Sequence, residues 1–371
     1  MRVLRWVFQI AVVGAVVGLL LVLIGNVRSN SSELGIPTGY DYLDNPAGFP
    51  IADSDFNQRQ PVRDAIRIGV INTLRVSLIG IVLATVLGTL IGLARLSQNW
   101  LLRNAARVYV EVIRNIPLLL IVIFAYAGIA LVLFPRITEP WEPLGIAIIS
   151  NRGVVVPWHD ASGWGIVAVG AVAGVVAWLV ARLRRRHADR TGTPARSGLW
   201  GGVAFAVVAA AGWLLVGADV TLPELAGRGT TGGIRMSPEF FAILFALVVY
   251  TASHIAEIVR GSIQAVPRGQ AEAASALALS GFQRSWFVVL PQAFRIAVPP
   301  LGNQYLNLTK NSTLGSAVSY FELAQVTSIS VANGAPAVPS YLLTLLIFLA
   351  ISLVLSLVVN VVNRRLALVE R

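Results

Sequence analysis

The sequence predicts an all-α fold, a polytopic bundle of about eight transmembrane helices. Hydrophobic residues make up 56% of the 371-residue chain and charged residues only 13%, with a mean hydropathy of +0.73. Soluble proteins carry about 25% charged residues, so we expect a lipid bilayer rather than water to contact much of this surface. Long apolar stretches recur along the chain, and arginines gather in every second connection between them.

Eight apolar stretches approach or exceed the length that crosses a bilayer. A hydrocarbon core of ~30 Å requires roughly 20 residues of helix. The expected spans cover residues 6–27, 70–93, 117–134, 163–180, 199–217, 240–258, 287–308 and 341–362.

The connections predict which way the spans run. Arginines between Arg182 and Arg196 separate the fourth and fifth spans, and others between Arg260 and Arg284 separate the sixth and seventh. The long connection 28–66 on the opposite side leans acidic. Because arginine is retained on the cytoplasmic side, we expect a multi-pass protein of the plasma membrane with both termini in the cytoplasm.

Four segments are expected along the chain. The first span is interpreted as an uncleaved anchor, since its apolar run is long and no Ala-x-Ala site follows it; a signal peptide is the alternative. The expected segments are 1–65 (anchor span and outer loop), 66–134 (first part of the core), 135–236 (an insertion with two spans) and 237–371 (second part of the core, with a cytoplasmic docking loop).

Composition argues against several classes of function. Cysteine is absent and three histidines are far apart, so neither a disulfide nor a metal site is expected. The net charge of +11 comes from short arginine runs without a basic face, so no nucleic-acid partner is expected. No phosphate-cradling G-x-x-x-x-G-K-[ST] loop and no nucleophile–base constellation occurs. We therefore expect no cofactor and no catalytic residues, and the chain is not expected to be an enzyme.

The cytoplasmic connection 260–295 predicts two short helices joined by a turn. Pro267 interrupts the chain, and residues 270–279 are rich in alanine, which favours helix. Ser280 and Gly281 are expected to end this helix, and a second short helix is expected to run up to Pro291. Such an elbow presents small apolar side chains to a socket on a soluble partner; an amphipathic hairpin on the membrane surface is the alternative.

The same connection carries a recognisable signature. The triplet Glu272, Ala273, Ala274, followed at a fixed distance by Leu290 and Pro291, resembles the EAA motif of bacterial ABC importer permeases. The family pattern has glycine at the position of Ala278, and here Gly281 supplies a flexible point three residues later. Further similarity to the polar amino acid branch of this family lies in residues 72–74, 109–119 and 299–312, and residues 94–100 resemble the general L-amino acid transporter permeases.

The resemblance implies an architecture and partners. It implies the five-helix core of type I ABC importer permeases, here with an extra N-terminal span and a two-span insertion. It also implies a bacterial inner-membrane complex of two permease subunits, the same or homologous, with separate ABC ATPase subunits and a soluble amino acid-binding protein. The ATPase would dock on the elbow, and the complex would take up polar L-amino acids.

The seventh span is unusually polar. Asn303, Asn307 and Asn311 recur every four residues and therefore form one stripe on a helix, beside Gln304. Polar groups are costly in hydrocarbon and usually face a cavity or a partner helix. We interpret the stripe as lining the substrate path; hydrogen bonding between helices without substrate contact is the alternative.

Other polar residues suggest structural pairs. Glu111 and Arg114 have the spacing of an ion pair on one helix face, as do His254 and Glu257, for which a gating role is the alternative. Glu322 falls in the outer loop after the seventh span, where it would meet an arriving ligand.

Span two carries small residues four apart. Gly80, Ala84, Gly88 and Gly92 lie on one helical face, which permits close approach of another backbone. We favour packing within the chain over an interface between subunits.

Two other functions compete with ATP-driven import. An ion-coupled secondary amino acid transporter would need acidic residues in mid-span, whereas here they cluster at span ends and in loops. A membrane scaffold without transport would use the amides of span seven only to tie helices together.

Overall fold

The computed structural model describes residues 2–33, 35, 37–52, 54–159, 163–192, 196–216, 219–227 and 229–366. Met1 and residues 367–371, at the ends predicted to be cytoplasmic, lie outside the described residues. The chain forms two compact units, one of Met1–Gly128 with Glu239–Arg371 and one of Ile129–Pro238.

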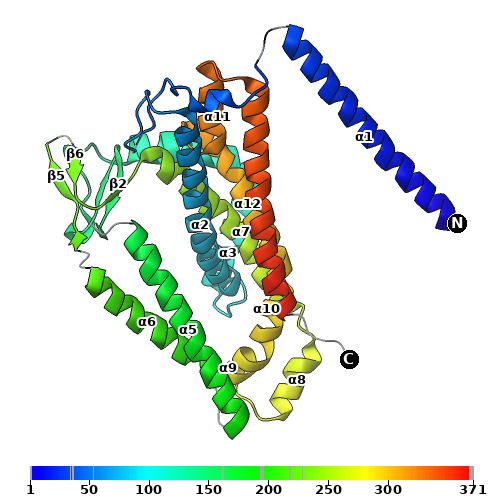
Figure 1. Ribbon diagram of the computed structural model, residues 1–371. Coiled ribbons are helices and arrows are strands. Elements are labelled where there is room, and N and C mark those ends of the chain that lie inside the picture. The colour runs from blue at the N-terminus through cyan, green and yellow to red at the C-terminus, as the bar shows by residue number, and fades with distance from the viewer. Residues whose placement is uncertain are drawn as a thin grey trace. The chain divides into compact units, whose positions relative to one another are not determined.

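The first unit is a helical bundle (Figure 1). Its long helices are α1 (Arg2–Glu33), α2 (Val62–Ala94), α7 (Pro238–Gln264), α10 (Leu290–Asn311) and α12 (Ala337–Leu366). Its shorter helices are α3 (Trp100–Asn115), α4 (Leu118–Ile123), α8 (Arg268–Ala276), α9 (Gly281–Arg284) and α11 (Leu323–Ala332), with 3₁₀ turns at Asp41–Asp44 and Ser312–Val318 and π-helical segments at Phe124–Leu133 and Ser285–Val289.

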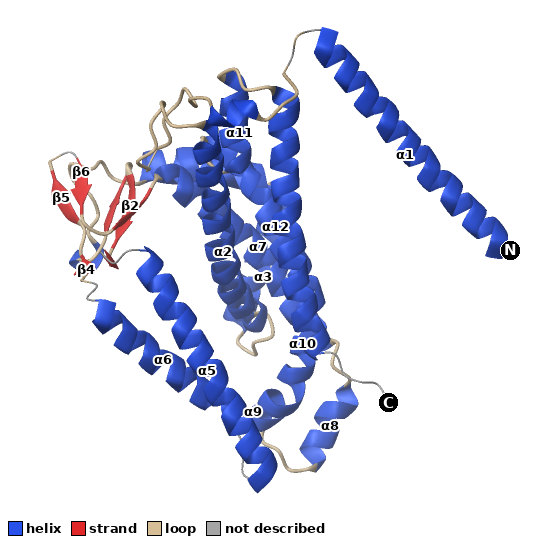
Figure 2. Cartoon of the chain, in the orientation of Figure 1, coloured by secondary structure: helices blue, strands red, loops and turns tan. Residues whose placement is uncertain are grey.

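The second unit combines a helical pair with small sheets. Helices α5 (Gly163–Thr191) and α6 (Ser197–Val216) pack together, and at Gly201 and Gly212 an added Cβ would meet α5 at 3.1 Å or closer. The strands of the described chain all belong to this unit (Figure 2). They are β1 (Ile148–Ser150), β2 (Gly153–Val156), β3 (Trp158–His159), β4 (Val220–Thr221), β5 (Glu224–Ala226), β6 (Gly229–Thr231) and β7 (Ile234–Met236), and a 3₁₀ turn covers Pro143–Gly145.

These strands were not expected of an all-α chain. They form antiparallel sheets in the order β1-β2-β7, with Ile148 opposite Val155, together with the pairs β3-β4 and β5-β6. β-branched residues fill β1 and β2, and such side chains favour strands. The helical prediction is otherwise confirmed.

The number of membrane crossings remains a prediction. Within the described residues, five helices are long and apolar enough to span, and α3 with the following helix makes a sixth if their 105° bend belongs to one crossing. The five are α1 from Trp6 to Val27, α2, α6, α7 and α12. Helices α5 and α10, which match the predicted fourth and seventh spans, are not among them. Amides, an arginine and a lysine reduce the apolar character of α10.

The outer loop and α11 form a hydrophobic cluster at one end of the bundle. Side chains from Tyr42 to Phe56 pack with the start of α2 and with Leu323 and Val326 of α11. Thr73 Oγ1 accepts a hydrogen bond from the Leu323 amide (3.1 Å), and Asn72 donates to the Phe321 carbonyl (2.9 Å). Helices α8 and α9 lie at the opposite end of the bundle (Figure 1).

The small-residue face of α2 packs within the chain. A Cβ at Gly88 would lie 2.7 Å from Ile255 Cβ, and one at Gly92 would lie 2.8 Å from the Ala256 carbonyl oxygen, both on α7. Gly80 faces Leu308 of α10. The structure thus confirms the intrachain reading, with the backbone of α2 pressed against α7.

Adding one methyl group at this contact is expected to destabilise the bundle. Gly88→Ala forces α2 away from α7, and overpacking of this kind costs about 1–3 kcal/mol, so the thermal midpoint in detergent should fall. Gly261→Ala on α7 is the matched control, because nothing lies within 4 Å of its added Cβ. Equal midpoints for the two variants would show that the α2–α7 contact is not close-packed.

Candidate functional site: a docking elbow and a polar helix

The elbow consists of α8, a tight turn and α9. Helix α8 begins after Pro267 and ends at Ala276, and Ala278 adopts a left-handed conformation with φ of 56°. Alanine in this conformation is strained by about 1–2 kcal/mol, which glycine avoids. The position where the family pattern has glycine is therefore the position that turns the chain.

Gly281 has a different role from the one expected. It does not end α8 but is the first residue of α9, which Ser280 caps. The Ser280 hydroxyl accepts from the Gln283 amide (3.3 Å), and the Gln283 side chain accepts from the Ser280 amide (2.9 Å). This capping box restarts a helix immediately after the turn. Pro291 likewise does not end α9; it lies in the first turn of α10.

Polar contacts hold the elbow in shape. The Arg284 guanidinium donates to Ser275 Oγ (3.1 Å), and the Gln292 amide donates to Gln270 Oε1 (3.3 Å), which ties α8 to the start of α10. Ala274, on the inner face of α8, is buried. The elbow is therefore a defined structure rather than a loose loop.

Five of the predicted docking residues lie on this elbow, and the other two, Leu290 and Pro291, begin α10. Glu272, Ala273, Ala278, Gly281 and Pro291 are exposed, Leu290 is half-buried and Ala274 is buried. Glu272 has no ion-pair partner among the described residues. Beside them, Leu277 is 77% exposed, which agrees with the expected display of alanine and leucine side chains. The sequence analysis missed the exposed Phe282 and Trp286, whose rings are stacked with centroids 6.1 Å apart.

The amide stripe lies on α10, which runs unbroken through Pro299 and Pro300. Asn303 and Asn307 are exposed, and Gln304 and Asn311 are half-buried. In the part of the chain that the structure describes, none of these four side chains donates to or accepts from another helix. Tyr305, between them, instead bonds Thr85 Oγ1 of α2 at 3.0 Å. The stripe is thus not used to tie helices within one chain.

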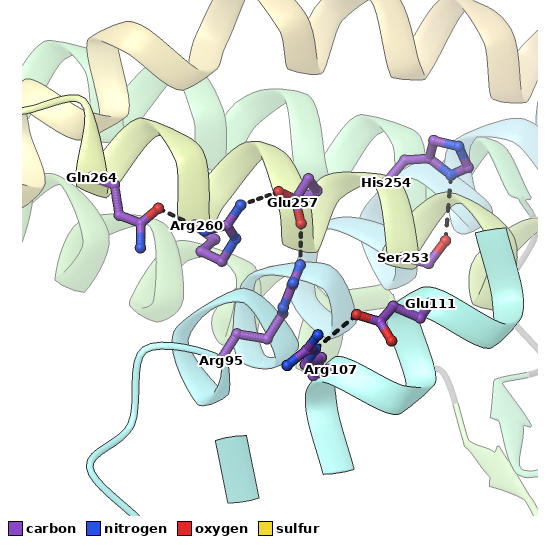
Figure 3. Close-up of polar contacts among 8 residues, drawn as sticks. All are labelled: Arg95, Arg107, Glu111, Ser253, His254, Glu257, Arg260 and Gln264. Atoms are coloured by element: carbon purple, nitrogen blue, oxygen red, sulfur yellow. Dashed lines mark hydrogen bonds and ion pairs between the residues drawn. The ribbon is translucent and has the colours of Figure 1, made fainter. Parts of the chain in front are cut away.

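A second polar cluster joins the end of α2 to α7 (Figure 3). The Glu257 carboxylate pairs with both Arg95 and Arg260, and Arg260 also donates to Gln264 Oε1 (2.6 Å). The arginines are 13% and 29% exposed, respectively. A carboxylate shared by two partly buried guanidinium groups fixes the end of α2 to α7.

The two side-chain pairs expected from helical spacing, Glu111 with Arg114 and His254 with Glu257, are both wrong. Glu111 pairs with Arg107 (2.8 Å) and not with Arg114. His254 does not pair with Glu257; its Nδ1 lies 3.1 Å from the Tyr250 carbonyl oxygen and 3.3 Å from Ser253 Oγ. These contacts favour helix-bound packing of the imidazole over a gating role.

Glu322 does not face an arriving ligand. It is fully buried and caps α11, accepting from the amides of Ala324 (2.8 Å) and Gln325 (2.7 Å). Burial raises the pKa of this carboxyl to about 7, against the lowering effect of the two amide donors. Its role is to start the short helix that lies at the end of the bundle opposite α8 and α9 (Figure 1).

Known proteins with the same organisation are transporter subunits. Residues 234–368 match the family model of the binding-protein-dependent transport system inner membrane component. The chain is 39% identical to YhdX of Escherichia coli (strain K12), named as an amino-acid ABC transporter permease protein, over 99% of this chain and 95% of that one. It is 37% identical to the general L-amino acid transport system permease protein AapQ of Rhizobium johnstonii, over 98% and 92%.

A solved structure shares the fold. An amino acid ABC transporter crystallised with histidines matches with a TM-score of 0.50 and 19% identity, over 82% of this chain and 94% of that one. With near-complete coverage of curated relatives, the resemblance inferred from the sequence is confirmed. The chain therefore belongs to the family of binding-protein-dependent transport system inner membrane components, the permease subunits of ABC transporters.

Proposed function

We propose that this chain forms the passage through which an ABC importer takes up polar L-amino acids, driven by a separate ATPase subunit. The observation that carries the proposal is the elbow, a braced helical hairpin that exposes Glu272 and large apolar side chains outside the bundle. Exposed apolar patches of this kind mark protein interaction sites. The names of the two curated relatives support amino acids as the substrate class.

The proposed orientation places the elbow in the cytoplasm. The arginine-rich connections then lie inside, with both termini, and α11 with the outer loop lies at the external face. A soluble binding protein would deliver substrate at that face. Two permease subunits, the same or homologous, would complete the passage in a bacterial inner membrane.

The amide stripe is the proposed lining of the substrate path. Exposed amides on a membrane helix need polar partners, which one chain does not supply here. A water-filled passage between two permease subunits supplies them. Amides suit a zwitterionic amino acid because they can accept from its ammonium group and donate to its carboxylate.

Reversal of charge at Glu272 is expected to uncouple the transporter. Glu272→Lys puts a positive charge in place of a negative one at the proposed ATPase contact. Because the side chain is exposed, the change causes no packing strain, and uptake should fall about tenfold or more. ATP-dependent uptake and ATP hydrolysis are measured in proteoliposomes that hold both subunits and the binding protein. Glu224→Lys, an equal change on an exposed strand of the second unit, is the control. Uptake at the wild-type rate by Glu272→Lys would contradict docking at this residue.

Loss of one stripe amide is expected to alter substrate handling. Asn307→Leu removes a hydrogen-bonding group from the path, and one such bond contributes about 1 kcal/mol, so KM for transported amino acids should rise about fivefold. The same assay with Gln58→Leu, which removes an exposed amide of the outer loop, should show no change. Unaltered KM and rate for every amino acid tested would favour a role in subunit contact.

A further inference from the structure

A basic cleft lies at the root of the elbow, apart from the docking surface and the amide stripe. Its volume is about 460 Å³, within the range of roughly 300–1,000 Å³ typical of ligand pockets. The polar groups that line it come from α2, α3 and α7, and include Arg95, Arg103, Arg107, Arg260, Glu111 and Gln264.

The cleft carries excess positive charge. Three of its four guanidinium groups share two carboxylates, because Glu257 pairs with Arg95 and Arg260 while Glu111 pairs with Arg107. Arg103 bonds the Ser97 carbonyl oxygen at 3.0 Å and has no carboxylate partner among the described residues. The Nε atom of Arg260 is buried without a hydrogen-bond acceptor there. An anion with several acceptor oxygens would satisfy the exposed guanidinium groups of Arg103 and Arg107.

The surroundings of the cleft indicate where such an anion comes from. Trp100 lines the cleft and Leu101 follows it on α3, and both side chains are exposed. Tryptophan is enriched at the level of lipid headgroups, and basic pockets between membrane helices on the cytoplasmic side hold anionic headgroups. In the proposed orientation, this cleft opens at the cytoplasmic leaflet.

We propose that the cleft binds a phosphate group, presented by an anionic phospholipid of the cytoplasmic leaflet. Arginine matches phosphate because its planar fork donates two parallel hydrogen bonds. Arg103 and Arg107 reach the phosphate from α3, and Arg260 from α7. The bound headgroup ties α3 to the last turn of α7.

This site has a consequence for the elbow. Gln264, the acceptor of the Arg260 bond, is the last residue of α7, and α8 begins at Arg268. A phosphate that steadies Arg260 therefore steadies the connection 265–267, through which movement of the elbow reaches the bundle. Anionic lipid would then determine how rigidly the elbow is connected to the helical bundle.

The test compares lipid binding to variants of the full-length chain. Native mass spectrometry in detergent measures the affinity for phosphatidylglycerol, with phosphatidylcholine and inorganic phosphate as separate probes. Each arginine near a membrane contributes about 1 kcal/mol toward anionic lipid, so Arg103→Gln with Arg107→Gln should weaken phosphatidylglycerol binding about 30-fold. Arg59→Gln with Arg67→Gln, an equal loss of exposed charge outside the cleft, should leave it unchanged.

Two further arms make the outcome decisive. Arg103→Lys with Arg107→Lys keeps the charge and should restore most of the affinity. This result would show that the glutamine variant binds lipid weakly because it has lost charge and not because it is misfolded. Amide exchange at Ala265 and Val266 should slow with phosphatidylglycerol in the wild type and not in the glutamine variant. If inorganic phosphate reproduces both effects and phosphatidylglycerol binds no better than phosphatidylcholine, the phosphate site stands and its lipid source is overturned. If the glutamine and control variants bind every probe equally, the site itself is overturned.

Discussion

The close approach of α2 to α7 is the contact on which the rest of the bundle depends. At Gly88 and Gly92 no room exists even for a methyl group. Beyond them, Glu257 of α7 pairs with Arg95, which directly follows α2, and with Arg260 of α7. Close backbone packing supplies dispersion over many atoms, whereas the shared carboxylate fixes the register of the two helices. Because α7 leads directly into α8, this pair is the rigid base from which the elbow projects.

The arrangement separates the parts that would move the chain from the parts that would contact substrate. The elbow projects at one end of the bundle, braced by contacts of Ser275 and Gln292. The amides of α10 find no hydrogen-bond partners on other helices of the described chain. The elbow would transmit a movement of the ATPase only if it is rigid. The amide stripe would bind a polar substrate only if its amides are not already hydrogen-bonded within the chain. The two regions meet these opposite requirements in one polypeptide, since α10 follows the elbow without a break in the chain.

Local patterns in the sequence predicted more of this protein than long-range pairs did. The stripe of Asn303, Asn307 and Asn311 follows from helical periodicity alone. Glu272 was singled out by the resemblance of its triplet to the EAA motif. The pairing of Arg95 with Glu257 does not, because 162 residues separate them and no local spacing brings them together. Glu322 was misread for a related reason: its burial depends on the packing of α11 against α2, which its own loop does not reveal. The turn at Ala278 was misplaced by three residues because Gly281 is the residue with the greater freedom, while the chain bends where tertiary contacts require it.

Docking of an ATPase subunit on the elbow can be measured directly, because the chain contains no cysteine. A single thiol introduced by Leu277→Cys can carry a photoactivated cross-linker on the exposed tip of the elbow. Leu144→Cys places an equally accessible thiol in the connection predicted to lie on the outer side. In the assembled transporter, the account predicts that the ATPase is captured from Leu277→Cys and not from Leu144→Cys. Capture at equal yield from both positions, or from Leu144→Cys alone, would contradict it.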